Sequence, residues 1–242
     1  MHLLLPASTD IYLTGGKSHE SEIRLAKFMI HNLAKGDCFV DVGTHYGYFS
    51  LLASKLVGNM GQVHSFEAAS TTFAMLKKNS RSKDNMQYYH KAVADEKGTI
   101  TFHEFPNLYS EYNSVDVKQF ENNDWFSKLV PQKIIVETID LSSFFLEKKL
   151  SPKLIKIDVE GAELKVITGV VNYIQQHAPL IAMEYLQSER NNTAHRQAVE
   201  LLQSLSYTYS ILDKEGALIV CEDIDAYLAE HRLESDNIVF SK

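Results

Sequence analysis

The stretch DVGTHYGYFS, from Asp41 to Ser50, joins an apolar run to an amphipathic one. The run before it, CFVDV at 38–42, is apolar up to a carboxylate, which is typical of a buried parallel strand that ends at a site. After it, apolar residues recur every three or four positions, as on the buried face of a helix: Phe49, Leu52, Ala53, Leu56 and Val57. A strand, a turn with two glycines and a helix form half of a βαβ unit, so this stretch predicts an α/β fold.

The glycines of the turn indicate which ligand it could receive. In the dinucleotide fingerprint G-x-G-x-x-G, the second glycine lets the backbone approach a pyrophosphate. Counted from Gly43, the second and third glycine positions hold His45 and Tyr48. A P-loop ends in Gly-Lys-Ser/Thr, whereas this chain has Tyr48-Phe49-Ser50. Both phosphate-binding interpretations are therefore disfavoured, and the pattern that remains is D-x-G-x-x-x-G.

A second strand, QVHSFEA at 62–68, ends in a carboxylate, Glu67. In βαβ sites a carboxylate about 20 residues beyond the glycines accepts hydrogen bonds from ribose hydroxyls. We therefore expect Glu67 to accept two hydrogen bonds from the ribose of a nucleoside. A nucleoside with a positive group suits a site flanked by Asp41 and Glu67. S-adenosylmethionine meets that description, because it combines adenosine with a sulfonium and an amino-acid tail.

Four stretches of the chain together resemble the FkbM-type class I methyltransferases. They are DVGTHYGYFS, SFEA, KAVADEKGTITFHEF and LIKIDVEGAELKVITG, and they occur in the order found in that family. The resemblance covers most of the chain, and His45 stands where the family more often has Asn. It implies a Rossmann-like class I methyltransferase fold, with a seven-stranded, mostly parallel sheet, helices on both faces and an antiparallel C-terminal strand. It also implies that S-adenosyl-L-methionine is bound by Asp41, Gly43, Thr44, His45, Tyr46, Gly47, Tyr48, Phe49, Glu67, Ala68, Ala92 and Asp158.

Composition and charge bound the class of protein. With 242 residues and 45% hydrophobic content, the chain can bury one core, and we expect a single domain with an N-terminal helical segment at 1–36. The formal net charge of −7, without a basic run, argues against a nucleic-acid substrate. No apolar run approaches about 18 residues, so we expect a cytoplasmic protein without a membrane partner. The oligomeric state stays open.

Strand-like and helix-like stretches alternate along most of the chain, which favours a parallel sheet. The alternating stretch GTITFHEF at 98–105 predicts an extra strand, and AHRQAVELLQSL at 194–205 predicts the last helix. The stretch YTYSILDKEGALIV at 207–220 predicts a hairpin with its turn at 213–216.

One segment departs from this alternation. Residues 104–133 are polar but contain several aromatic residues. These include Tyr109, Tyr112, Trp125 and Phe126. Long loops of this kind are often lids or binding loops. We predict a lid on the substrate side, and the alternative is an insertion whose aromatic residues only anchor it to the core.

The stretch KIDVEGAEL at 156–164 concentrates carboxylates at the end of a strand. Asp158 and Glu160 share a face in an extended strand, and Glu160 and Glu163 become neighbours where a helix begins, so three carboxylates are expected to gather. The alternative role for Glu160 and Glu163 is to stabilise the positive end of that helix. Lys156 lies inside an apolar strand and must pair with a carboxylate, for which Asp158 is the candidate.

Methylation of a hydroxyl requires in-line approach of the oxygen, exclusion of water and a base for the proton. The candidate catalytic residues are Asp158, Glu160 and His45, and His45 would offer a pKa near neutrality. Glu184 could hold substrate hydroxyls or pair with a basic neighbour, and residues 113–115 resemble a polar loop of the family. No metal is expected, because the ten histidines show no close ligand pair. A divalent ion between Asp158 and a substrate diol is the alternative.

The sequence therefore predicts an S-adenosylmethionine-dependent methyltransferase that acts on a hydroxyl of a small molecule. The substrate class, a sugar or polyketide-like compound, comes from the resemblance alone. Two alternatives remain at this point. One is an NAD-dependent oxidoreductase, which the missing glycines disfavour, and the other is a non-catalytic module that binds the nucleoside.

Overall fold

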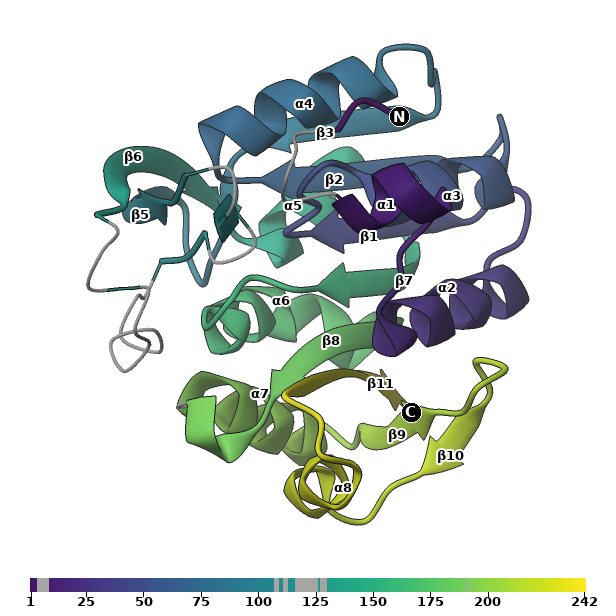
Figure 1. Cartoon of the computed structure of the whole chain (residues 1–242). Coiled ribbons are helices and arrows are strands. Elements are labelled where there is room, and N and C mark those ends of the chain that lie inside the picture. The colour runs from purple at the N-terminus through teal and green to yellow at the C-terminus, as the bar shows by residue number, and fades with distance from the viewer. Residues whose placement is uncertain (4–8, 107–108, 111–112, 116–125, 127–129, 191) are drawn as a thin grey trace.

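The computed structural model describes residues 1–3, 9–106, 109–110, 113–115, 126, 130–190 and 192–242. Its centre is an eight-stranded sheet in the order β10-β9-β11-β8-β7-β1-β2-β3 (Figure 1). The parallel strands are β1 (Cys38–Val42), β2 (Gln62–Glu67), β3 (Met86–His90), β7 (Pro152–Ile157) and β8 (Leu180–Leu186). The remaining strands are β9 (Thr208–Leu212), β10 (Leu218–Val220) and β11 (Ser235–Ser241). The α/β fold with a mostly parallel sheet is thus confirmed.

The strand count differs from the predicted seven. The closing strand β11 lies between β8 and β9 and is antiparallel to both, as predicted for the C-terminal strand. The eighth strand, β10, is the second arm of a hairpin with β9. Its turn is fixed by Asp213, whose Oδ1 accepts hydrogen bonds from the backbone N–H of Glu215 and Ala217, both at 2.8 Å. The sequence predicted this hairpin, but the seven-stranded pattern has no place for its outer arm at the sheet edge.

A second sheet of three strands stands beside the carboxyl ends of the central strands (Figure 1). Its strands, in spatial order, are β4 (Ala92–Val93), β6 (Gln132–Ile139) and β5 (Gly98–Glu104). β5 was predicted as an extra strand from its alternating pattern, whereas β6, with which it pairs antiparallel, was not predicted. The predicted lid, 104–133, is therefore the connection between β5 and β6.

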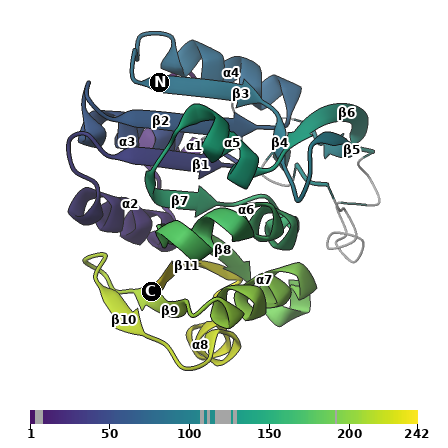
Figure 2. The same cartoon turned by 180° about the vertical axis from the view of Figure 1, so that it is seen from behind.

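Helices cover both faces of the central sheet, as predicted (Figures 1 and 2). One face carries α2 (Glu20–Asn32) and α3 (Tyr48–Val57), and the other carries α5 (Leu141–Lys148), α6 (Glu163–His177) and α7 (Thr193–Ser204). The further helices are α1 (Thr9–Thr14), α4 (Ser70–Ser80), η4 (Ser188–Arg190) and α8 (Ile224–His231). The helix α8, after the predicted last helix α7, is short and capped by Asp223, whose side chain accepts from the N–H of Ala226.

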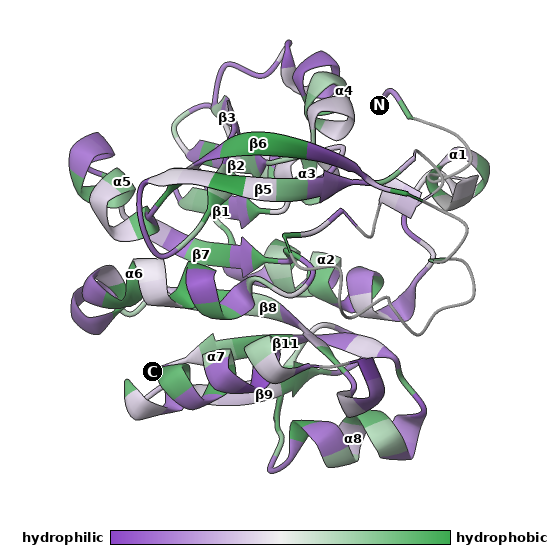
Figure 3. Ribbon diagram, turned by 90° about the vertical axis from the view of Figure 1, so that its left-hand side faces the viewer, coloured by the Kyte–Doolittle hydropathy of each residue, from purple (hydrophilic) through white to green (hydrophobic). Residues whose placement is uncertain are grey.

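Alternation along the strands supplies both apolar layers. In β1, Phe39 packs with α2 and α3, while Val40 and Val42 pack with the layer of α5 and α6. Figure 3 shows the central strands coloured as apolar and the helices with mixed faces. Within the described ranges, no helix combines the length and the apolar character needed to cross a membrane.

Candidate functional site

A cavity of about 500 Å³ lies at the carboxyl ends of β1, β2, β7 and β8. This is where parallel α/β sheets bind their ligands. The predicted site residues that line it are Gly43, Thr44, His45, Tyr46, Tyr48, Phe49, Glu67, Ala68, Ala92, Asp158 and Glu160. The other two predicted residues are Asp41, in β1, and Gly47, in the turn that follows β1, and they do not line the cavity.

The turn after β1 requires glycine at its first position. Gly43 has a φ of +76°, and a Cβ at this residue would lie 1.7 Å from the backbone oxygen of Asp158. The two strand ends are joined there, because the N–H of Asp158 donates to the backbone oxygen of Val42 at 3.0 Å. A side chain at Gly43 would therefore push apart the two loops that form the floor of the cavity.

Four backbone N–H groups of this turn donate hydrogen bonds within the protein. Those of Gly43 and Thr44 both donate to the oxygen of Phe66, at 3.1 Å. The N–H of His45 donates to Oε2 of Glu67 at 2.8 Å, and that of Gly47 donates to the oxygen of Thr44 at 2.8 Å. A phosphate-binding loop instead presents such groups to its ligand. This hydrogen bonding agrees with the sequence pattern, which also disfavours a cofactor with a pyrophosphate.

Asp41 lies beneath the turn and holds its shape. Its side chain is fully buried, and Oδ2 accepts hydrogen bonds from Thr44 Oγ1 at 2.9 Å and Ser50 Oγ at 2.6 Å. The ammonium of Lys156 is 3.8 Å from the other carboxylate oxygen. These contacts give Asp41 a structural role, while its direct contact with a cofactor stays a prediction.

Glu67, at the end of β2, connects three neighbouring segments. Oε1 accepts from the N–H of Ala69 at 2.9 Å and from Thr72 Oγ1 at 2.8 Å, and Oε2 accepts from the N–H of His45. A carboxylate offers about four acceptor positions, so these bonds leave room for about one donor from a ligand rather than the expected two. Burial raises the pKa of Glu67 to about 6, although the hydrogen bonds oppose this shift.

The raised pKa predicts that cofactor affinity depends on pH. Ionised Glu67 accepts a ribose hydroxyl better than the protonated acid, so the dissociation constant should rise by up to about tenfold per pH unit below the pKa of Glu67. Glu67→Gln should remove this dependence and weaken binding by about tenfold or more. Calorimetry with S-adenosylhomocysteine across this pH range measures both effects.

The matched control for this prediction is Glu104→Gln. Glu104 is also a buried carboxylate near α4, where it accepts from the N–H groups of Ser70 and Thr71, but it does not line the cavity. Because the charge of Glu104 adds to the raised pKa of Glu67, Glu104→Gln should keep a pH-dependent cofactor affinity, with the dependence moved toward lower pH. If Glu67→Gln binds as tightly as the wild type, Glu67 only supports the turn.

A cluster of carboxylates lines the cavity where β7 and β8 end. One carboxylate oxygen each from Asp158, Glu160 and Glu184 lies within 4.8 Å of the others, and all three residues line the cavity. Lys156, as predicted, pairs with Asp158, with Nζ 3.0 Å from Oδ2. Arg190 lies 3.8 Å from the carboxylate of Glu160.

The pKa values of two carboxyl groups in this cluster are shifted in opposite directions. Although burial alone would raise it, the pKa of Asp158 is lowered by the charge and hydrogen bond of Lys156. The pKa of Glu184 is raised well above its usual value by burial and by the charges of Asp158 and Glu160. Glu184 therefore takes up a proton more readily than Asp158.

Glu163 does not join this cluster, in contrast to the prediction of three gathered carboxylates at 158–163. Its buried carboxylate accepts from the N–H groups of Val159 at 3.2 Å and Gly161 at 3.0 Å, and it lies 3.2 Å from Nε2 of His195. The alternative reading, stabilisation of the helix start, describes it better. Glu184 takes the third place in the cluster because β8 ends beside β7.

His45 lacks the near-neutral pKa expected from the sequence. Burial lowers its pKa to about 3, assisted by the charges of Lys17 and Lys156 and opposed by that of Asp158. The ring Nε2 lies 3.1 Å from Ser110 Oγ, which is also 3.0 Å from the hydroxyl of Tyr46. A neutral His45 therefore fits a role in holding the β5–β6 connection over the turn better than a role as base.

The described part of the predicted lid reaches the cavity. Ser110, Asn113 and Val115 line it. Tyr112 and Trp125, on which the lid prediction partly rested, lie outside the described residues. The lid function stays a prediction.

Sequence reasoning missed the contribution of the N-terminal segment and of β11. These lining residues include Ile11, Lys17, His19, Glu22, Ser235 and Asn237. For Lys17 a signal was present, because Gly15-Gly16 precedes it and interrupts the predicted helical segment. For Asn237, only the pairing of β11 with β8 brings it opposite Glu184.

Three carboxylates at this spacing could hold a metal ion. Among the described residues, Asp158, Glu160 and Glu184 form the group with that geometry. Lys156 already compensates Asp158, and acidic groups also gather without an ion. The expectation that no metal takes part stays a prediction.

Solved structures with the same fold are methyltransferases at low sequence identity. The methyltransferase FkbM from Methylobacillus flagellatus KT aligns with a TM-score of 0.53 and 12% identity, over 87% of this chain and 44% of its own. The chain thus spans less than half of that protein. A putative rRNA methylase from Clostridium thermocellum aligns with a TM-score of 0.53 and 10% identity, over 93% and 99% of the two chains. Precorrin-6y C5,15-methyltransferase from Geobacter metallireducens GS-15 aligns at 0.50 and 13%, over 91% and 87%.

The match of the sequence to a protein family is more specific than these structural similarities. No curated protein matches the chain in sequence. Residues 41–209, more than half of the chain, match the family described as the methyltransferase FkbM domain. This range begins at Asp41 of the glycine turn and includes Glu67, Asp158 and Glu184. The chain therefore belongs to the FkbM methyltransferase family, whose cofactor is S-adenosyl-L-methionine.

Proposed function

We propose that this methyltransferase methylates a hydroxyl oxygen of a small molecule, with a sugar or polyketide-like compound as the acceptor class. The carboxylates of Asp158, Glu160 and Glu184, close together in the cavity wall, carry this proposal. A hydroxyl is a hydrogen-bond donor, and ionised carboxylates accept from it strongly. Neutral polyols can place several hydroxyls on such a wall.

The cofactor fits the opposite half of the cavity. Glu67 has an acceptor position left for a ribose hydroxyl, and Ala68, Ala92, Val93 and Phe102 add small and apolar surface beside it. Four amides of the glycine turn already donate to protein oxygens, which suits a cofactor without phosphates. Bound S-adenosylmethionine supplies an activated methyl group next to this turn.

The residues of the chain would then bind and orient the acceptor and take up its hydroxyl proton. Lys156 keeps Asp158 ionised and fixes one of its oxygens, so the other oxygen can accept the hydrogen bond of the acceptor hydroxyl. As the carbon–oxygen bond forms and the carbon–sulfur bond breaks, the hydroxyl proton passes to Asp158. Glu160 and Glu184 would hold further hydroxyls of the acceptor.

Nucleic acid is a less suitable acceptor, although one protein of the same fold is described as a putative rRNA methylase. The chain carries a net charge of −7, and its cavity wall is acidic where an acceptor would enter. Phosphates need clustered Lys and Arg side chains. We therefore propose a small-molecule acceptor, and a cytoplasmic location stays a prediction of the sequence.

The decisive experiment measures methyl transfer with a panel of sugars, polyketide-like alcohols and RNA. Formation of S-adenosylhomocysteine together with a methyl ether, identified by mass spectrometry, is the expected result for a small alcohol. Methylated RNA, or a methylated nitrogen or carbon, would contradict the proposal. Product formation unchanged by a chelator would support the expectation that no metal is involved.

A further inference from the structure

The amino-acid tail of the cofactor carries a carboxylate that needs a positive or N–H partner. In the glycine turn, the described N–H bonds of Gly43, Thr44, His45 and Gly47 end on protein oxygens. In the loop after β7, those of Val159 and Gly161 end on Glu163. Because these N–H groups already have acceptors, a cationic side chain at the cavity is a suitable partner for the negative group.

Among the described residues, the lysines that line the cavity are Lys17, Lys91 and Lys156. Lys156 is 3% exposed and is held between Asp158 and Asp41. Lys91 lies at the small sheet, where it pairs with Glu137 at 2.7 Å. Lys156 is thus held by two carboxylates, and Lys91, which precedes β4, is not among the charges that act on His45 or Asp158.

Lys17 is suited to this task. Its side chain is 18% exposed, and its charge lowers the pKa of both His45 and Asp158, so it acts on the space between the turn and β7. Its ammonium pairs with Glu22 at 2.8 Å, and Glu22 also lines the cavity. An ammonium that is held at the wall but is not fully buried can bind an anionic group with little desolvation.

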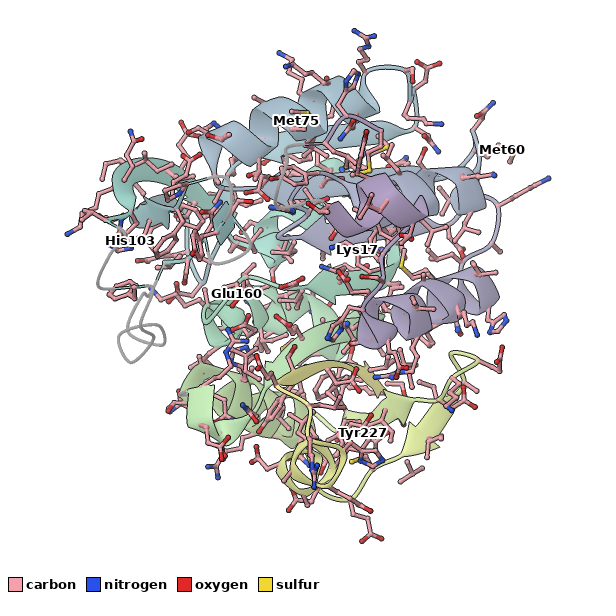
Figure 4. All side chains as sticks on the ribbon, viewed as in Figure 1. Lys17, Met60, Met75, His103, Glu160 and Tyr227 are labelled. Atoms are coloured by element: carbon pink, nitrogen blue, oxygen red, sulfur yellow. The ribbon has the colours of Figure 1, made fainter. Side chains whose placement is uncertain are left out.

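The position of Lys17 also follows from the fold. Lys17 lies between α1 and α2, on the same side of the sheet as both (Figure 4). Gly15, with a φ of +79°, ends α1 and turns the chain toward this point. The start of the chain is tied to the site as well, because Nδ2 of Asn79 donates to the backbone oxygens of His2 and Tyr46.

We propose that Lys17 binds the carboxylate of the cofactor's amino-acid tail. The N-terminal segment, outside the residues 41–209 that match the family, thereby completes the cofactor site. This inference rests on cofactor binding and does not depend on which acceptor is methylated. The same ammonium could instead meet an anionic group of the acceptor, and the test separates the two sources.

The test compares two ligands that differ only in the tail region. S-adenosylhomocysteine has the amino-acid tail, whereas 5′-methylthioadenosine ends at a methylated sulfur. Lys17→Met should weaken binding of S-adenosylhomocysteine by about ten- to one-hundredfold, the usual effect of a charge-assisted bond, and leave 5′-methylthioadenosine unchanged. Calorimetry on the full chain gives both dissociation constants without a need for turnover.

Two further variants separate ligand binding from the structural role of the ion pair. Glu22→Gln removes the partner of Lys17 but keeps the ammonium, so S-adenosylhomocysteine should bind at least as tightly as in the wild type. Lys17→Arg should retain most of the affinity. If Glu22→Gln weakens binding as much as Lys17→Met, the ion pair only supports the wall and the proposal is wrong.

Other outcomes also decide whether Lys17 contacts the amino-acid tail of the cofactor. Equal weakening of both ligands by Lys17→Met, or no weakening of either, contradicts a contact with the tail. Unchanged S-adenosylhomocysteine affinity with a raised KM for the acceptor would assign Lys17 to the acceptor instead. Failure of the wild type to bind either ligand would overturn cofactor binding itself, whereas failure to methylate an alcohol would leave this inference intact.

Discussion

Replacing Asp158 by Asn is expected to lower the rate of methyl transfer by about 10²–10⁴-fold, the usual contribution of a general base. The substitution preserves the size of the side chain and can still accept from Lys156, so the fold should survive. It removes the negative charge that would receive the hydroxyl proton. Cofactor affinity should change much less, because the turn and Glu67 are the residues expected to hold the cofactor, and both line the cavity.

Single-turnover methyl transfer and calorimetry on the same preparation measure the two effects separately. Glu160→Gln should reduce turnover less than Asp158→Asn, because Glu160 is paired with Arg190 rather than with the buried lysine. His45→Asn should also have the smaller effect, since a histidine whose pKa is about 3 is a weak base. Loss of turnover in His45→Asn alone would move the base to the glycine turn.

A different result would assign the cluster to binding. If Asp158→Asn, Glu160→Gln and His45→Asn all lose cofactor affinity in proportion to rate, these side chains hold the ligand. The proton would then leave through water or through another group at the cavity. The pH dependence of the wild type helps to decide, because a rate limited by His45 would titrate close to its low pKa.

The parts of the fold that depend on local pattern were predictable. The strand, glycine turn and helix at 38–57 and the carboxylate that ends β2 follow from periodicity and spacing. So does the pairing of Lys156 with Asp158, because a lysine in a buried strand requires a carboxylate partner and Asp158 is two residues away on the same face of the strand. Local rules were sufficient where the interacting residues are near in sequence.

The parts that depend on distant contacts were not predictable in this way. Glu163 turned inward because a histidine of α7 and two backbone N–H groups of its own loop surround it. Glu184 entered the cluster only through the adjacency of β7 and β8. The pKa of His45 is lowered by the burial of its ring, which contacts Ser110 of the β5–β6 connection, and the sequence does not show that this ring is buried. Lys17 reached the cavity through the path of the N-terminal segment across the sheet.

Lys156→Met is expected to destabilise the fold by about 3–5 kcal/mol, the cost of removing one partner from a buried ion pair. The ammonium is 3% exposed and lies against Asp158 and Asp41, with the ring of Phe49 5.3 Å from Nζ. Methionine fills a similar volume but leaves two carboxylates without a cation. For a chain of this size, the melting temperature should fall by about 6–20 °C.

The matched control is Lys153→Met, which makes the same change at an exposed position of the same strand. Its stability should stay within about 0.5 kcal/mol of the wild type. The double variant Lys156→Met, Asp158→Asn should recover part of the loss, since one uncompensated charge is removed. Equal melting temperatures for Lys156→Met and Lys153→Met would show that the buried lysine is not needed to compensate the carboxylates.

The pH dependence of this destabilisation distinguishes lost charge compensation from lost packing. In the wild type the pKa of Asp158 is lowered by Lys156, so its stabilising contribution is present above the unfolded-state pKa and is lost as pH falls through the folded-state value. In Lys156→Met, burial without this cation should raise the folded-state pKa of Asp158 above its unfolded value, so protonation stabilises the variant. The difference in free energy of unfolding should therefore shrink as the pH falls from about 7 toward about 4, the range in which this carboxyl takes up a proton. A packing defect would leave that difference constant across the same range, and urea titrations of both proteins at each pH provide the measurement.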